Sequence, residues 1–190
     1  MKTEDRTDRR EIEAKYLVRG DGWRGHGVAR EIVQGFLSRD PERVVRVRVI
    51  DEDGYLTVKG ASTDLERAEY EFRIPLEDAH ALLRLCLPYP VHKIRHEIRH
   101  SDVLWEVDEF LDDNAGLTLV ELEFPAGDSA AGTQERKRVI EETRPSWVGK
   151  EVSGEARYYN AVLSSRPFSE WSREQREDMD FHARGDQPGP

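Results

Sequence analysis

Glu11-Ile-Glu-Ala-Lys-Tyr-Leu-Val18 (EIEAKYLV) is the stretch of sequence that decides the fold. In an extended strand, successive side chains point to opposite faces. The charged members of the stretch share one face and the apolar members share the other: Glu11, Glu13 and Lys15 against Ile12, Ala14 and Tyr16. This two-residue alternation predicts a strand with two chemically different faces.

The same alternation recurs along the chain and predicts eight strands in total. The other seven segments are 30–37, 43–50, 55–59, 66–74, 91–100, 103–111 and 117–124. Residues 51–54 (DEDG) predict a hairpin turn in which Gly54 takes a positive φ, and residues 112–116 predict a second turn. We therefore expect an antiparallel sheet.

Helices are fewer. Residues 75–87 (PLEDAHALLRLCL) begin with proline and place acids at the positive end of the helix dipole, and Cys86 lies on their apolar stripe as a small buried hydrophobe. Further helices are predicted at 156–164 and 168–182. Residues 126–144 predict a loop with some helical character, and 184–190 a disordered tail.

Composition narrows the class of protein. Charged residues make up 36% of the 190 residues, and the net charge of −10 argues against nucleic acid as the main partner. The single cysteine excludes an internal disulfide and fits a reducing compartment. The start MKTEDRTDRR is charged and has no apolar core, so we expect no signal peptide, and no apolar run is long enough to cross a membrane. We therefore expect a cytoplasmic protein.

The charged faces of the eight strands can be interpreted in two ways. An antiparallel sheet with one solvated face produces the same alternation. However, these faces concentrate carboxylates and arginines as pairs two residues apart, where solvated faces usually mix Thr, Ser, Gln and Lys. Closing the sheet into a barrel turns the charged faces inward and removes the exposed edges. This favours a closed eight-stranded antiparallel β-barrel with helices packed outside, an α+β fold.

A lumen of this kind would hold eight carboxylates and seven cations. They are Glu11, Glu13, Glu69, Glu71, Glu106, Asp108, Glu121 and Glu123, and Lys15, Arg46, Arg48, Lys59, Arg73, Lys93 and Arg95. Clustered carboxylates suit Mg²⁺ or Mn²⁺, which prefer oxygen ligands. Clustered arginines and lysines suit phosphate oxygens. The residues together predict a site for a metal-bound anion with several phosphates, and exclude an apolar ligand.

These motifs resemble the CYTH superfamily, also called triphosphate tunnel metalloenzymes. EIEAK at 11–15 matches the ExExK signature of that family. The resemblance continues through RVRV (46–49), LTVKG (56–60), ExE (69–71), KIR (93–95), WEVDEF (105–110), VELEF (120–124) and the segment 146–163, close to the bacterial branch. It covers about residues 10–163 and implies an eight-stranded antiparallel tunnel with helices outside.

The resemblance also implies roles for the lumen residues. The metal ligands would be Glu11, Glu13, Glu106, Asp108, Glu121 and Glu123. The phosphates would be bound by Lys15, Arg46, Arg48, Lys59, Arg73, Lys93 and Arg95. Glu69, Glu71 and Lys93 would be catalytic. Arg73 stands where bacterial relatives often carry a third Glu, a departure that bears on metal preference and substrate length.

The implied activity is hydrolysis of inorganic triphosphate with Mg²⁺ or Mn²⁺. Alternatives of the same fold are an adenylate cyclase and a thiamine or nucleoside triphosphatase. A non-catalytic polyphosphate-binding module is the alternative from another class. His92, His96 and His100 recur every four residues but fall on the outward face of their strand, which argues against a metal site.

The predicted organisation has three parts. Residues 1–9 form a flexible N-terminus, 10–163 the tunnel domain, and 164–190 a helical extension with a tail. Three roles stay open for that extension: packing on the barrel, covering its mouth, or forming a homodimer. The expected partner is a small polyphosphate, with neither nucleic acid nor membrane.

Overall fold

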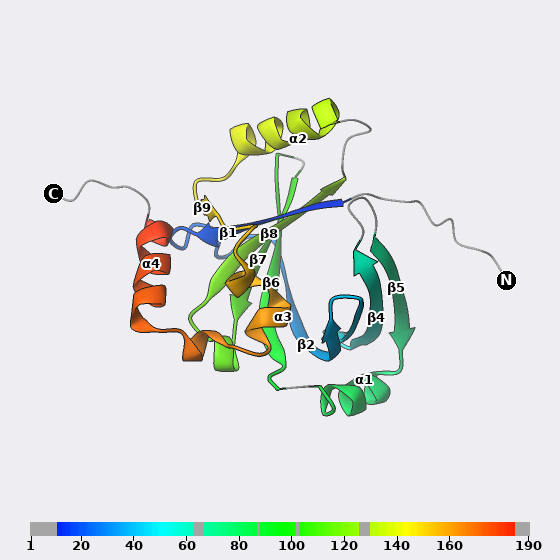
Figure 1. Cartoon of the computed structure of the whole chain (residues 1–190). Coiled ribbons are helices and arrows are strands. Elements are labelled where there is room, and N and C mark those ends of the chain that lie inside the picture. The colour runs from blue at the N-terminus through cyan, green and yellow to red at the C-terminus, as the bar shows by residue number, and fades with distance from the viewer. Residues whose placement is uncertain (1–10, 63–66, 87, 102, 126–129, 185–190) are drawn as a thin grey trace.

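The computed structural model describes residues 11–62, 67–86, 88–101, 103–125 and 130–184. One antiparallel sheet of nine strands forms its body (Figure 1). The strands are β1 (Glu11–Val18), β2 (Val28–Asp40), β3 (Arg43–Ile50), β4 (Asp53–Ser62), β5 (Arg67–Ile74), β6 (Val91–His100), β7 (Val103–Phe110), β8 (Thr118–Pro125) and β9 (Val148–Glu151). All eight predicted strands are confirmed, whereas β9 was not predicted.

The sheet is not closed, so the predicted closed barrel is wrong. Its strand order is β5-β4-β3-β2-β6-β7-β8-β1-β9, which leaves β5 and β9 at the two edges. The physical reason is the short strand β9, which pairs with the edge of β1 that closure would require, with Tyr16 opposite Glu151. The sheet instead curves, so that β4 and β5 stand apart from β1 and β8 (Figure 1).

The hairpin between β3 and β4 differs from its prediction. The residue with positive φ is Asp51, at 52°, and Gly54 already belongs to β4. Glycine is needed at position 54 for another reason: a Cβ there would lie 2.8 Å from the Cβ of Ala79 in helix α1 (Leu76–Leu83). In the second predicted turn, Gly116 does take a positive φ, of 94°.

Helix α1 covers the outer face of β2, β3 and β4. Its Ala79 and Leu83, with Cys86 after its end, pack on Val47 and Val49 of β3. A Cβ at Gly35 of β2 would lie 2.6 Å from the Cβ of Cys86, so helix and sheet are in close contact. Cys86 is 7% exposed, which confirms it as a small buried hydrophobe.

The outer face of β1, β7 and β8 is covered by helix α2 (Ala130–Thr143) and by the segment around Trp147. Trp105, fully buried, packs edge-on against both Tyr16 and Trp147. The predicted loop with some helical character at 126–144 is therefore a helix from Ala130 onward, anchored on the sheet by Ile140; residues 126–129 lie outside the description.

The predicted helix at 156–164 is two short pieces. A 3₁₀ turn at Ala156–Tyr158 and helix α3 (Asn160–Leu163) are separated by Tyr159, whose backbone is extended at φ −78° and ψ 135°. The helix predicted at 168–182 is likewise a 3₁₀ turn at Phe168–Glu170 followed by α4 (Arg173–Arg184).

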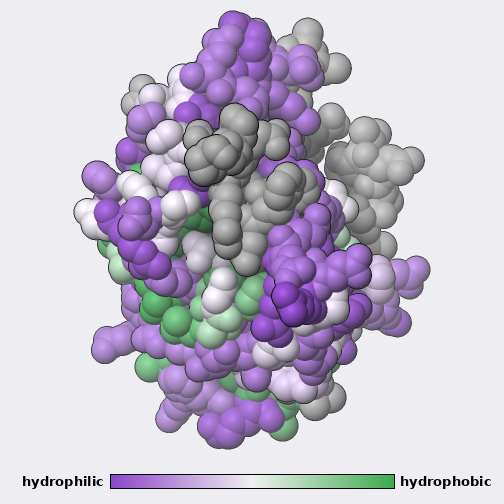
Figure 2. Space-filling model, turned by 90° about the vertical axis from the view of Figure 1, so that its left-hand side faces the viewer, coloured by the Kyte–Doolittle hydropathy of each residue, from purple (hydrophilic) through white to green (hydrophobic). Residues whose placement is uncertain are grey.

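The C-terminal segments close one end of the concave face of the sheet. Leu17, Phe110 and Leu119 lie on the same strand faces as the charged residues, but they pack in an apolar cluster with Leu163 of α3 and Met179 of α4. Phe168 and Trp171 of the extension belong to the same cluster. The side of the molecule that carries α4 is mostly hydrophilic, with a smaller hydrophobic patch (Figure 2). In the described part of the chain, no helix combines the length and apolarity that crossing a membrane requires.

Two histidines of β6, His92 and His96, contact different groups. His92 bonds Asp112 and Glu31, each at 2.8 Å, whereas His96 packs against the ring of Trp23 at 4.8 Å between centroids. Among the described residues, neither histidine belongs to a group of three or more side chains that could hold a metal ion.

The environment of His92 makes stability pH-dependent. Although partial burial lowers its pKa, hydrogen bonds to Asp112 and Glu31 outweigh this effect and raise it. The contribution to stability is therefore fully present below the unfolded pKa of about 6.5 and is lost as pH rises through the higher folded pKa. We expect His92→Gln to destabilise the protein at pH 5.5 by up to about 1 kcal/mol and much less at pH 9, measured by urea unfolding. An equal loss at both pH values would contradict this assignment.

Candidate active site

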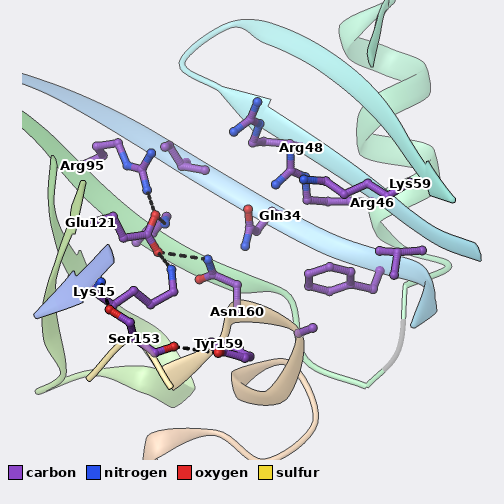
Figure 3. A pocket seen from close by; sticks show the side chains of 15 residues that line it. Lys15, Gln34, Arg46, Arg48, Lys59, Arg95, Glu121, Ser153, Tyr159 and Asn160 are labelled. Carbon is purple, nitrogen blue, oxygen red and sulfur yellow. Dashed lines mark hydrogen bonds and ion pairs between the residues drawn. The ribbon is translucent and has the colours of Figure 1, made fainter. Parts of the chain in front are cut away.

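A cavity of about 380 Å³ lies on the concave face of the sheet, between two charged walls and under α3 (Figure 3). The first wall, β6–β7–β8–β1, contributes Lys93, Arg95, Glu121 and Lys15, and the second, β3–β4, contributes Arg46, Arg48 and Lys59. β2 lies between the two walls. Among the described residues the charged lining thus comprises six cations and one carboxylate.

The first wall is a network of buried ion pairs. Lys93 is 2% exposed and donates to Asp108, which is fully buried. Arg95 donates from Nε and from Nη2 to Asp108, both at 2.7 Å, and also reaches Glu106 and Glu121. The Nζ of Lys15 donates to Glu121 at 2.6 Å. Buried charges are tolerated when they are paired and hydrogen-bonded in this way.

Glu121 is the centre of this network. Burial alone would raise its pKa, but Lys93, Arg95 and Lys15 hold the pKa well below its usual range. Burial, and then the neighbouring Arg95, lower the pKa of Lys93, against the opposite effect of Asp108 and Glu121. The carboxylate of Glu121 therefore stays ionised among cations.

The second wall is less neutralised. Arg48 donates to Glu71 at 3.0 Å, and Lys59 lies 2.8 Å from Glu69. Both acids belong to the edge strand β5, and their side chains are 37% and 45% exposed. The Nε atoms of Arg46 and Arg48 are buried and find no hydrogen-bond partner in the described part of the chain. Burial and then Arg48 lower the pKa of Arg46. The second wall therefore has N–H donors that can bind an anion.

Four polar residues of the cavity were not among the predicted site residues: Gln34, Ser153, Tyr159 and Asn160. Three come from the C-terminal segment that contains α3 and borders the cavity. The Oγ of Ser153 accepts from the backbone N–H of Lys15 at 3.0 Å, and Asn160 donates to Glu121 at 3.4 Å. For Ser153, Tyr159 and Asn160 the sequence offers one signal, the resemblance of segment 146–163. For Gln34 it offers none, because a neutral side chain does not contribute to the alternation of charges.

The predicted binding residues meet at the cavity with one exception. Lys15, Arg46, Arg48, Lys59, Lys93 and Arg95 all line it. Arg73 does not: it pairs with Asp53, and its side chain is 72% exposed. The predicted catalytic residue Lys93 is in the lining. Glu69 and Glu71 are not, but Glu69 pairs with Lys59, and Glu71 with Arg46 and Arg48, which line it.

The predicted metal ligands are only partly described. Among them, Glu121 lines the cavity, and Glu106 and Asp108 lie behind it as acceptors for Arg95. The side chains of Glu11, Glu13 and Glu123 lie outside the description, but the register of β1 and β8 puts Glu13 directly opposite Glu123. The described side chains alone contain no cluster of three metal-ligating groups.

This arrangement of strands and charges agrees with a known family. The model of the CYTH domain matches residues 9–159. The chain belongs to the CYTH domain family. That membership confirms the resemblance drawn from EIEAK and the later charged pairs.

Two curated CYTH relatives match almost along their full length. The chain is 38% identical over 160 residues to an inorganic triphosphatase of Acetivibrio thermocellus, covering 84% of this chain and 96% of the relative. It is 31% identical over 158 residues to an inorganic triphosphatase of Nitrosomonas europaea, covering 81% and 96%.

Solved structures agree with the fold. The crystal structure of the inorganic triphosphatase NE1496 matches with a TM-score of 0.60 and 29% identity, covering 82% of this chain and 94% of that one. A putative adenylyl cyclase from Hippeastrum, described as having a dominant triphosphatase activity, matches with a TM-score of 0.53 at 13% identity and supports the fold alone.

Proposed function

We propose that this CYTH protein is a metal-dependent triphosphatase whose preferred substrate is inorganic triphosphate. The observation that carries the proposal is the cavity itself, whose charged lining, as far as the side chains are described, consists of six cations and one carboxylate. Such a lining suits a small, highly charged anion. Relatives at 38% and 31% identity that carry the name inorganic triphosphatase support the same substrate.

The two walls contribute differently to substrate binding. Arg46, Arg48 and Lys59 have the spare donor capacity to bind phosphoryl oxygens, as guanidinium forks and as a point charge. Lys15, Lys93 and Arg95 approach from the opposite side but are held by carboxylates. A substrate between the walls is fixed in one orientation and is surrounded by positive charge where negative charge develops during phosphoryl transfer.

The acids are suited to a divalent cation. Like charges directly opposite each other on neighbouring strands repel, and Glu13–Glu123 and Glu106–Glu121 are both opposed in this way. Arg95 offsets the second pair, because it contacts both of its carboxylates. For the first pair we propose a metal ion as the counter-ion. Glu11, Glu13, Glu121 and Glu123 would hold Mg²⁺ or Mn²⁺, with Glu106 and Asp108 behind them.

The metal, when bound, would supply charge neutralisation and polarise the phosphoryl oxygens. The chain supplies the rest. Glu71 accepts from Thr57 at 2.8 Å and from Arg48, and with Glu69 it borders the second wall, where it can orient a water for in-line attack. Arg48 links this carboxylate to the substrate site and stabilises charge on the transferred phosphoryl group.

A substrate and metal panel tests the proposal. We expect rapid phosphate release from inorganic triphosphate with Mg²⁺ or Mn²⁺, at least 10-fold slower release from ATP and thiamine triphosphate, and none with excess EDTA. Equal rates on ATP would favour the nucleoside triphosphatase alternative, and cyclic AMP formation the cyclase. Metal-independent binding of triphosphate without hydrolysis would favour the binding module and contradict the proposal.

A further inference from the structure

Gln34 occupies the middle of the cavity, between the two walls. It lies on β2, with Arg48 of β3 opposite it on one side and Val91 of β6 on the other. Its side chain lines the cavity (Figure 3). Ile32 and Phe36, on the same face of the strand, line it as well. The alternation of charges along the strands could not identify it, because it is neutral.

The carboxamide of Gln34 is buried but incompletely bonded. The residue is 2% exposed, and its Nε2 finds no hydrogen-bond partner among the described residues. A buried N–H donor without an acceptor is unfavourable, and such groups call for an explanation. Among the described side chains that line the cavity, the one carboxylate, that of Glu121, accepts from Lys15, Arg95 and Asn160 rather than from Gln34. The Oδ1 of Asn160 is a second buried group of the lining without a partner in the described structure.

The neighbouring side chains indicate which kind of group would accept a hydrogen bond from the Nε2 of Gln34. The Nε atoms of Arg46 and Arg48, on the strand next to Gln34, are also buried donors without a partner in the described structure. Three unsatisfied N–H groups on two adjacent strands therefore border one cavity of cationic lining. A group with several acceptor oxygens and negative charge satisfies all of them together, and a phosphate group has these properties.

We propose that Gln34 is a substrate-binding residue that donates from Nε2 to an oxygen of the triphosphate between the two cationic walls. This inference rests on the proposed function and adds a binding group to it. A neutral donor fixes the position of the anion without adding another positive charge beside Arg48. It also implies that the empty site is less stable than one with an apolar side chain at the same position.

The test is Gln34→Met, which keeps the length of the side chain and removes its polar atoms. We expect KM for inorganic triphosphate to rise about 10- to 100-fold, the range for a lost hydrogen bond to a charged group. The thermal midpoint without substrate should stay the same or rise. The affinity for inorganic triphosphate in EDTA, measured by calorimetry, should fall by a similar factor. Gln34→Glu, which offers only acceptors to the anion, should bind more weakly still.

A matched control is Gln134→Met, on the exposed surface of α2, which should leave KM and affinity unchanged. An unchanged KM and affinity in Gln34→Met would overturn the proposal. So would a fall of several degrees in its thermal midpoint, because that result identifies Gln34 as a structural residue. If the wild-type protein binds triphosphate in EDTA but does not hydrolyse it with metal, the proposed function fails, while the affinity comparison still decides the role of Gln34.

Discussion

Asp108→Asn should lower the free energy of unfolding by about 3–5 kcal/mol, the range for removing one partner from a buried ion pair. Asp108 is fully buried and accepts from Lys93 and from two nitrogens of Arg95. An amide keeps the shape of the side chain but leaves the ammonium of Lys93, itself 2% exposed, without its closest counter-charge. Urea unfolding followed by circular dichroism measures the loss.

Two further variants separate charge from packing. Glu109→Gln, the adjacent residue on the opposite face of β7, breaks a partly exposed pair with Arg24 and should cost no more than about 1 kcal/mol. The double variant Lys93→Met with Asp108→Leu removes both charges and should recover much of the stability, without activity. If Asp108→Asn costs no more than Glu109→Gln, the network of the first wall is not the stabilising element described here.

Arg48→Ala should reduce kcat/KM for inorganic triphosphate by about 10²–10³, with a higher KM and a lower kcat together. Arg48 lines the cavity, has a buried Nε without a partner in the described structure, and donates to Glu71. Its removal takes away both a phosphate contact and the connection to the carboxylate that orients water. Steady-state phosphate release at saturating metal measures both constants.

The control for this variant comes from the same strand. Arg43 begins β3, its side chain is 76% exposed, and it pairs locally with Asp40 outside the cavity. Arg43→Ala should therefore retain wild-type kinetics. Equal, small effects of Arg43→Ala and Arg48→Ala would show that the second wall does not bind the substrate.

The charged faces of the strands were predictable from sequence because alternation depends only on the local geometry of an extended chain. The alternation assigns Lys15, Arg46 and Lys93 to the charged faces of their strands, and the structure brings all three to one cavity. The antiparallel pairing was predictable from the short turns between successive strands. Alternation and turn residues are both local features of the sequence.

Closure of the sheet was not predictable in the same way. It depends on which segment pairs with the free edge of β1, and the four-residue strand β9 is too short to show an alternation. Likewise, the strand faces that carry Lys15 and Glu121 become apolar at Leu17 and Leu119, where the C-terminal helices pack. Such pairings are long-range, and local propensity does not encode them.

Gln34 and Asn160 are site residues that the sequence could not predict. Both are neutral, and nothing in the period of their segments distinguishes them from structural residues. Their importance became visible only through tertiary neighbours: Asn160 donates to Glu121, and Gln34 lies across from Arg48 with an unsatisfied donor. Arg73 is the converse case, since its alternation placed it in the lumen but its position on the edge strand leaves it 72% exposed.

The most direct test of the central claim is the initial rate of phosphate release from inorganic triphosphate by the wild-type protein, before and after excess EDTA and again after Mg²⁺ or Mn²⁺ is restored. We expect release that stops with EDTA and recovers with the metal. Release that is unaffected by EDTA, or no release under any of the three conditions, would contradict the assignment of the charged cavity as a metal-dependent triphosphatase site.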